Sequence, residues 1–156
     1  MELRQARPGA AVELPQGVYT LDRVTHCRAT ALEWLIFELV AEEATVPGSS
    51  PPSSAGGCPH CPTLALIADR LYEVVVTAAE ALPDDAALTV EQQTYRRRHR
   101  GEARGERSGR TGHADFWLGQ YRHYEGDSRV LIFMDVHGEI QCLTGKAMDL
   151  RLVRAY

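Results

Sequence analysis

The chain has 156 residues, which gives room for one domain or for two very small domains packed together. Its 17 basic and 21 acidic residues give a formal net charge of −4, which argues against a general nucleic-acid binder or a membrane-surface protein. No apolar run approaches the ~20 residues of a membrane span, and the charged first residues do not fit a signal peptide. We therefore expect a cytoplasmic protein with no membrane insertion.

The first half of the sequence predicts five short β-strands. Val12 and Leu14 share one face of a strand, and farther on Trp34, Ile36 and Glu38 would share one face while Leu35, Phe37 and Leu39 share the other, with the period of two that strands require. The predicted strands cover residues 10–14, 18–27, 32–41, 63–68 and 72–78.

An insertion separates the third and fourth of these strands. Twelve of the eighteen residues at 45–62 are Pro, Gly or Ser, a composition typical of a flexible loop. The insertion contains Cys58, His60 and Cys61 in a Cys-Pro-His-Cys sequence, which is half of a tetrahedral zinc site and is also similar to the redox motif of thioredoxin-fold oxidants. Neither a second Cys-x-x-Cys nor a following helix is predicted, so we expect two nearby loop thiols, either free or oxidised to a local disulfide, and no cofactor. A zinc site at Cys58, Cys61 and His60, or a redox site, is the alternative.

Arginine is concentrated in the second half of the chain. Residues 96–110 hold seven Arg and two Glu, a local charge of +5, whereas the remaining 10 basic and 19 acidic residues give −9. We expect a long charged hairpin there, in which Arg96, Arg98 and Arg100 share one face and Arg97 and His99 share the other. The candidate residues for partner or polyanion binding are Arg96, Arg97, Arg98, Arg100, Arg104 and Arg107.

The two halves of the sequence resemble each other in three blocks. Val12 and Tyr19 align with Leu88 and Tyr95 at an offset of 76, Trp34 aligns with Trp117 at 83, and Leu66 aligns with Ile132 at 66. The last block also aligns Asp69 with Asp135 in matching hairpin turns, the second of which ends at Gly138. We therefore predict a duplicated, all-β protein with little helix. Residues 1–82 and 83–156 would be two five-stranded units, folded as small SH3-like barrels or as a shared sandwich.

The chain also resembles the "domain of unknown function 4178" family of bacterial and archaeal proteins over residues 9–40 and 84–153. The residues that carry this diffuse resemblance are Gly9 to Leu14, Tyr19, Trp34, Leu39, Gly101, Glu102, Phe116, Trp117, Tyr121 and Gly145. Members often occur beside envelope-stress and polyamine-related proteins, so the resemblance implies an accessory or binding role. It supplies no catalytic residues.

The motifs of common enzyme classes, such as GxGxxG, GxxxxGK[ST], HExxH and GxSxG, are absent from the sequence. We therefore expect a non-enzymatic β-domain that binds a protein partner, a second copy of itself or a ligand. Nucleic-acid or polyanion binding through the arginines is the alternative, and a metal or redox site at the Cys-Pro-His-Cys sequence is a second alternative.

Overall fold

The computed structural model describes residues 2–41 and 61–156, which form one antiparallel sheet of eleven strands. The strands are β1 (Ala11–Leu14), β2 (Gly17–Ala29), β3 (Glu33–Ala41), β4 (Thr63–Ile67), β5 (Arg70–Ala79), β6 (Ala87–Val90), β7 (Gln93–Gly109), β8 (Ala114–Gly126), β9 (Arg129–Val136), β10 (Glu139–Ala147) and β11 (Arg154–Ala155). Helix in the described residues is limited to two 3-10 segments, Leu3–Gln5 and Leu150–Leu152. The prediction of an all-β protein is confirmed.

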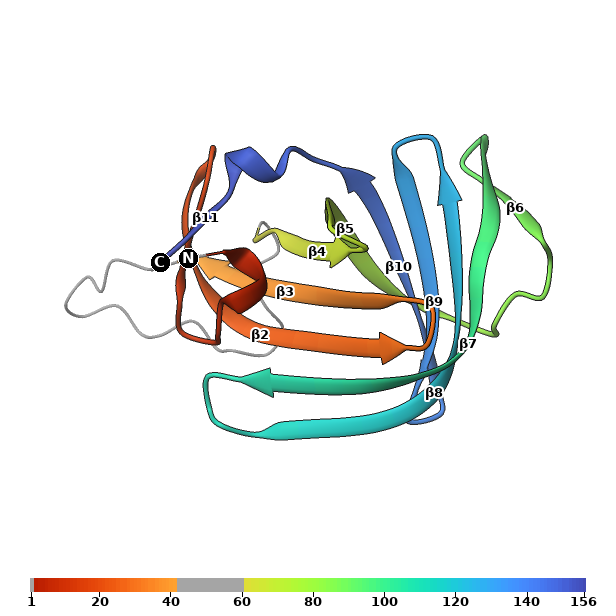
Figure 1. Cartoon of the computed structure of the whole chain (residues 1–156), viewed down its shortest axis with the longest axis horizontal. Coiled ribbons are helices and arrows are strands. Elements are labelled where there is room, and N and C mark those ends of the chain that lie inside the picture. Colours follow the sequence, from red (N-terminus) through yellow and green to blue (C-terminus); the bar gives the residue numbers. More distant parts are fainter. Residues whose placement is uncertain (1, 42–60) are drawn as a thin grey trace.

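Eight of these strands close into a single barrel. The sheet order is β11-β1-β2-β3-β4-β5-β10-β9-β8-β7-β6, and an additional pairing of β2 with β7 joins the two ends of the barrel wall. Figure 1 shows β7 running beside β2, while β1, β11 and β6 lie outside the closed ring. The expectation of two small barrels or a sandwich was wrong, because β5 pairs with β10 and β2 with β7, so both halves share one wall.

Two-residue turns fix the register of several hairpins. Ala68 and Asp69 join β4 to β5 with φ of 48° and 67°, and His137 and Gly138 join β9 to β10 with φ of 53° and 85°. Two successive positive φ values define the type I′ turn, whose twist matches that of the strands. The alignment of Asp69 with Asp135 is therefore wrong by three residues: Asp69 corresponds to Gly138 in the second turn, and Asp135 lies in β9. Its side chain accepts a 2.8 Å hydrogen bond from the Gly138 N–H.

The core has three parts. The barrel interior is filled by buried side chains that include Trp34, Tyr72, Trp117 and Tyr121. A second cluster around Phe37 lies on the outer face of the first half, under the N-terminal segment and β11, and a third, with Tyr95, Tyr124 and Leu131, lies outside the second half. Both tryptophans are buried, as the sequence predicted, at 2% and 7% exposure.

A β-bulge in β2 and another in β7 move each strand from an outer cluster to the barrel interior. Leu21 lies in the outer cluster, but past the bulge Arg23 pairs with Glu38 on the interior side. The register of β7 against β8 shifts in the same way between Arg97 and His99. A bulge inserts one residue and so reverses which side chains face inward.

The Arg-rich segment lies in one long strand, β7, instead of folding as a hairpin of its own. The turn that follows β7 begins only at Arg110, and β7 is paired with β8 along most of its length. Most of the insertion predicted at 45–62 lies outside the described residues. In the described part of the chain, no helix is long and apolar enough to cross a membrane.

Candidate functional site

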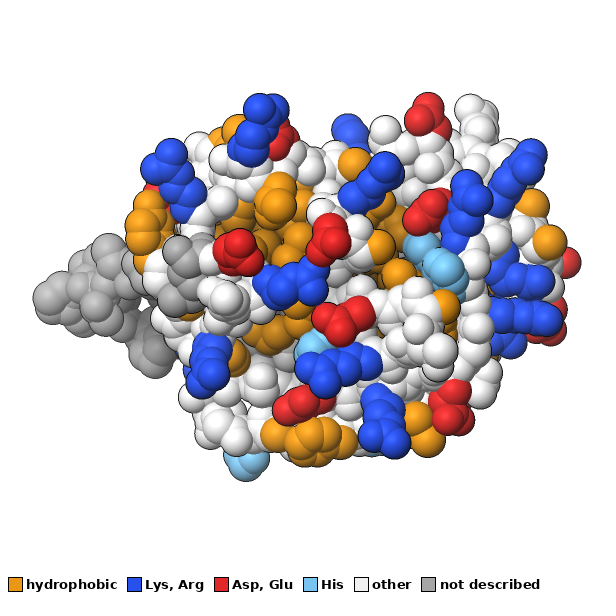
Figure 2. Space-filling model, in the orientation of Figure 1, with side chains coloured by type: hydrophobic (Ala, Val, Ile, Leu, Met, Phe, Trp, Pro, Cys, Tyr) orange, Lys and Arg blue, Asp and Glu red, His pale blue; other side chains and the backbone are white. Residues whose placement is uncertain are grey.

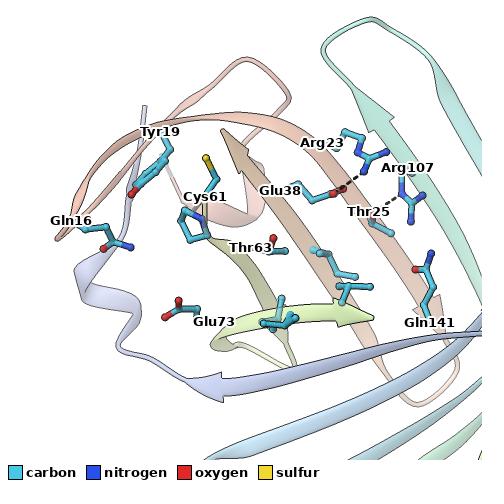
Figure 3. Close-up of a pocket in the computed structure, with 15 residues that line it drawn as sticks. Gln16, Tyr19, Arg23, Thr25, Glu38, Cys61, Thr63, Glu73, Arg107 and Gln141 are labelled. Carbon is cyan, nitrogen blue, oxygen red and sulfur yellow. Dashed lines mark hydrogen bonds and ion pairs between the residues drawn. The ribbon is translucent and has the colours of Figure 1, made fainter. Parts of the chain in front are cut away.

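A cleft of about 640 Å³ opens in the barrel wall where β4 is short. Strand β4 begins at Thr63, opposite Val74, so within the described residues the rest of β5, from Val75 to Ala79, has a partner strand only in β10. The described lining residues are Gln16, Tyr19, Arg23, Thr25, Ile36, Glu38, Cys61, Pro62, Thr63, Glu73, Val74, Val75, Val76, Arg107 and Gln141. Figure 3 shows these residues, contributed by both halves of the chain.

Arg107 lies at one end of this cleft. It pairs across the β2–β7 seam with Thr25, and its Nε donates a 3.1 Å hydrogen bond to the Thr25 hydroxyl (Figure 3). Its guanidinium carbon lies 5.2 Å from the centre of the Trp117 ring, a cation–π contact. These two contacts hold the guanidinium plane in place, and among the described residues they leave most of its N–H donors without a partner.

No carboxylate in the described part of the chain lies within ion-pair distance of Arg107. Asp115 faces Arg107 across the β7–β8 ladder but pairs with His137, whose Nε2 lies 2.9 and 3.1 Å from its two carboxylate oxygens. Arg107 is thus a half-buried cation without a described counter-ion.

The other charged groups of the cleft are paired or distant. Arg23 donates a 2.7 Å hydrogen bond to Glu38, and this bond raises the pKa of Arg23. Glu73 lies toward the opposite end of the cleft from Arg107 and Gln141 (Figure 3). The end of the cleft near Arg107 therefore favours an anion.

The cleft shares part of its lining with the apolar barrel interior. Thr25, Ile36, Val76, Arg107 and Gln141 line both the cleft and a narrower interior space of about 20 Å³, whose other walls include Trp34, Trp117 and Leu143. The indole Nε1 of Trp117 is buried and has no hydrogen-bond partner among the described residues. The site thus combines a polar mouth with an apolar floor, as small-molecule sites commonly do.

The six arginines identified in the sequence do not form one surface. Arg96, Arg98, Arg100 and Arg104 are exposed, and Lys and Arg side chains gather over the end of the molecule where β6 and β7 lie (Figure 2). Arg97 is half-buried and donates a 3.0 Å hydrogen bond to the carbonyl of Asp84. Arg107 lies in the cleft. Sequence reasoning thus found Arg107 but placed it on a charged outer surface.

Of the three candidate metal ligands, only Cys61 lies in the described part of the chain. Cys61 is disulfide-bonded, and its Sγ accepts a 3.2 Å hydrogen bond from the Ala41 N–H. Cys58 and His60 lie outside the described residues. Among the described residues, no group of three or more potential metal ligands occurs. The zinc hypothesis stays a prediction.

Sequence reasoning missed Arg23, Thr25 and Gln141 as site residues. Each occupies an ordinary strand position, and nothing in the local pattern distinguishes it from a solvent-facing residue. A barrel wall turns alternate residues inward, so only the closed topology shows that these three side chains meet.

The chain matches no family model, no curated protein and no solved structure. The resemblance to the "domain of unknown function 4178" family therefore stays an expectation from the sequence.

Proposed function

We propose that this protein is a non-enzymatic binding domain that takes a small ligand in the cleft between β3 and β5. The observation that carries this proposal is a cleft of about 640 Å³ in the wall of an eight-stranded barrel, part of whose lining also lines the apolar interior. Barrels of this size have an interior that side chains fill or that holds one small molecule. Here the described side chains leave about 20 Å³ inside the barrel and the larger cleft in the wall beside it.

The cleft chemistry supports binding over catalysis. Its one close acid–base pair, among the described lining residues, is the ion pair of Arg23 with Glu38. Cys61 is disulfide-bonded and so offers no thiolate nucleophile. A catalytic nucleophile would need an adjacent base. The hydroxyl of Thr25, among the described lining residues, instead accepts a hydrogen bond from Arg107.

The alternative of polyanion binding through β7 has less support. Past the bulge, the outward face of β7 presents Arg100 and Arg104, but Glu102 and Glu106 share that face. Alternating charges weaken the attraction to a phosphate backbone, which needs several unopposed cations.

The proposal is tested with N-phenyl-1-naphthylamine, an uncharged fluorescent probe of apolar pockets. We expect the wild-type protein to bind it with blue-shifted, saturable fluorescence, and we expect Val76→Trp, which fills the cleft, to reduce the affinity at least tenfold. Thr77→Trp is the matched control, because Thr77 is the next residue on the same strand and pairs with Cys142, outside the interior cluster.

The measurement is a fluorescence titration alongside a thermal melt of each variant. Failure of the folded wild-type protein to bind the probe would contradict the proposal. So would equal affinities for Val76→Trp and Thr77→Trp, since the probe would then bind elsewhere.

A further inference from the structure

We infer that the ligand of this cleft carries an oxyanion, a carboxylate or a phosphate, which Arg107 binds beside the apolar part of the molecule. This inference rests on the proposed function and adds the chemical class of the ligand. It depends on two groups, one buried and one half-buried, that each retain N–H donors without an acceptor among the described residues.

The first donor is the Arg107 guanidinium. It has five N–H groups, of which only the Nε–H has a partner in the described part of the chain, the hydroxyl of Thr25 at 3.1 Å. The free edge of a guanidinium presents two parallel N–H groups that match the two oxygens of a carboxylate or phosphate. Stacking on Trp117 at 5.2 Å orients this edge before the ligand arrives.

The second donor is the indole N–H of Trp117, buried and without a partner among the described residues. An unsatisfied buried donor costs free energy, so such groups commonly mark a place where a ligand or water completes the hydrogen bonding. Arg107 and Trp117 line the same interior space beneath the cleft. Both groups donate and neither accepts, so the complementary ligand group is an acceptor.

The neighbouring charges leave this position to an external anion. Glu38 is engaged by Arg23 at 2.7 Å, and Asp115 is engaged by His137 at 2.9 Å. Glu73, the remaining carboxylate among the described lining residues, is toward the other end of the cleft (Figure 3). A neutral ligand would leave Arg107 without the charge partner that a half-buried cation favours.

The experiment compares two probes that share the same ring system. 1-Anilinonaphthalene-8-sulfonate carries an oxyanion, and N-phenyl-1-naphthylamine does not, so the ratio of their dissociation constants measures the preference for the anion. We expect Arg107→Gln to shift this ratio by about tenfold or more against the anionic probe, as loss of a charge-assisted hydrogen bond does. Arg107→Lys, which keeps the charge but not the paired N–H groups, should shift it less.

Arg104→Gln is the matched control, because Arg104 lies on the same strand but is exposed on the outward face. We expect it to leave the ratio unchanged. Displacement of the anionic probe by 1-naphthoate and by 1-naphthyl phosphate, with 1-naphthol as the neutral reference, then shows which oxyanion the cleft prefers.

The outcomes separate this inference from the proposed function. If the uncharged probe binds in the cleft but the ratio is the same in wild type and Arg107→Gln, the oxyanion inference is wrong and the binding function stands. An equal shift of the ratio of dissociation constants in Arg104→Gln also overturns the inference, because the shift would then reflect the overall positive charge of β7 and not a specific contact with Arg107. If neither probe binds the folded protein, the proposed function itself is wrong.

Discussion

At the scale of single residues, His123 is the side chain whose environment most changes its chemistry. It is 1% exposed, faces the barrel interior from β8, and neither ring nitrogen has a hydrogen-bond partner in the described residues. Burial is the main reason that the pKa of His123 is lowered from 6.5 to about 4, and the charges of His99 and Arg98 on β7 lower it further. The Oε1 atom of Glu125 lies 3.5 Å from Nε2 of His123. The folded protein therefore holds His123 neutral.

This environment predicts acid sensitivity. Above pH 6.5 the contribution of His123 to the unfolding free energy is fully present. It is lost as the pH falls from 6.5 toward 4, because in this range the unfolded chain binds a proton that the folded protein does not. The loss is on the order of 3 kcal/mol, since one pKa unit corresponds to about 1.4 kcal/mol. We expect His123→Phe to flatten the dependence of the unfolding free energy on pH across this window, measured by denaturant titration.

The control for this prediction is His113→Phe, at an exposed position in the β7–β8 turn. It should keep the pH dependence of the wild type. A wild-type slope that persists in His123→Phe would mean that other groups cause the acid sensitivity.

Gly105 is a second residue whose identity the packing requires. A Cβ added there would lie 2.0 Å from the Trp117 ring, much closer than any real contact. We expect Gly105→Ala to lower the unfolding free energy by about 1–3 kcal/mol, as overpacking of a core does, and to change the Trp117 fluorescence. Gly109→Ala on the same strand, where the nearest atom is the Arg23 side chain at 3.3 Å, should cost much less. Equal costs for the two variants would show that Trp117 moves aside freely.

At the scale of elements, β7 has two functions that its bulge separates. Before the bulge, Tyr95 packs in the outer cluster and Arg97 holds the loop that leads into β6. After the bulge, Ala103 and Gly105 lie against the barrel interior and Arg107 enters the cleft. The charge of the segment is therefore divided among an anchor, an exposed surface and the cleft.

The anchor predicts that the arginines of β7 differ in their effect on stability. Arg97 donates to the Asp84 carbonyl at 3.0 Å, next to the point where the Tyr124 hydroxyl donates to the Asp85 carbonyl at 2.7 Å. We expect Arg97→Ser to lower the unfolding free energy by about 1 kcal/mol, the net value of such a bond. Arg96→Ser and Arg100→Ser, at exposed positions, should have almost no effect. Similar melting temperatures for all three variants would contradict the anchoring role.

At the scale of the whole molecule, the strand order is the same when read from either half toward the centre. Strands β1 to β5 form one half of the sheet and β6 to β10 form the other, and the last strands of the two halves, β5 and β10, pair with each other. The second strand of each half, β2 or β7, pairs with its counterpart and closes the barrel. The bulges also correspond, because Asp22 and Arg98 are separated by the offset of 76 that aligns Tyr19 with Tyr95. This arrangement favours the predicted duplication, which stays a hypothesis.

The amino-acid sequence by itself determined the all-β character of the protein and the approximate limits of the five strands in its first half. Alternation around Trp34 and turn residues such as Gly138 act over a few neighbouring residues, so their effect can be read locally. Burial of Trp34 and Trp117 followed for the same reason, since large apolar side chains on alternating strands face a core.

Only the tertiary structure decided how the strands join and where the site lies. Barrel closure depends on β2 pairing with β7 across about eighty residues, for which no local pattern exists. Strict alternation placed Arg97 and His99 on one face, but the bulge between them sends Arg97 to the outer cluster and His99 to the interior side with His123. The same shift directs Arg107 into the cleft, because one inserted residue reverses the facing of every side chain that follows it.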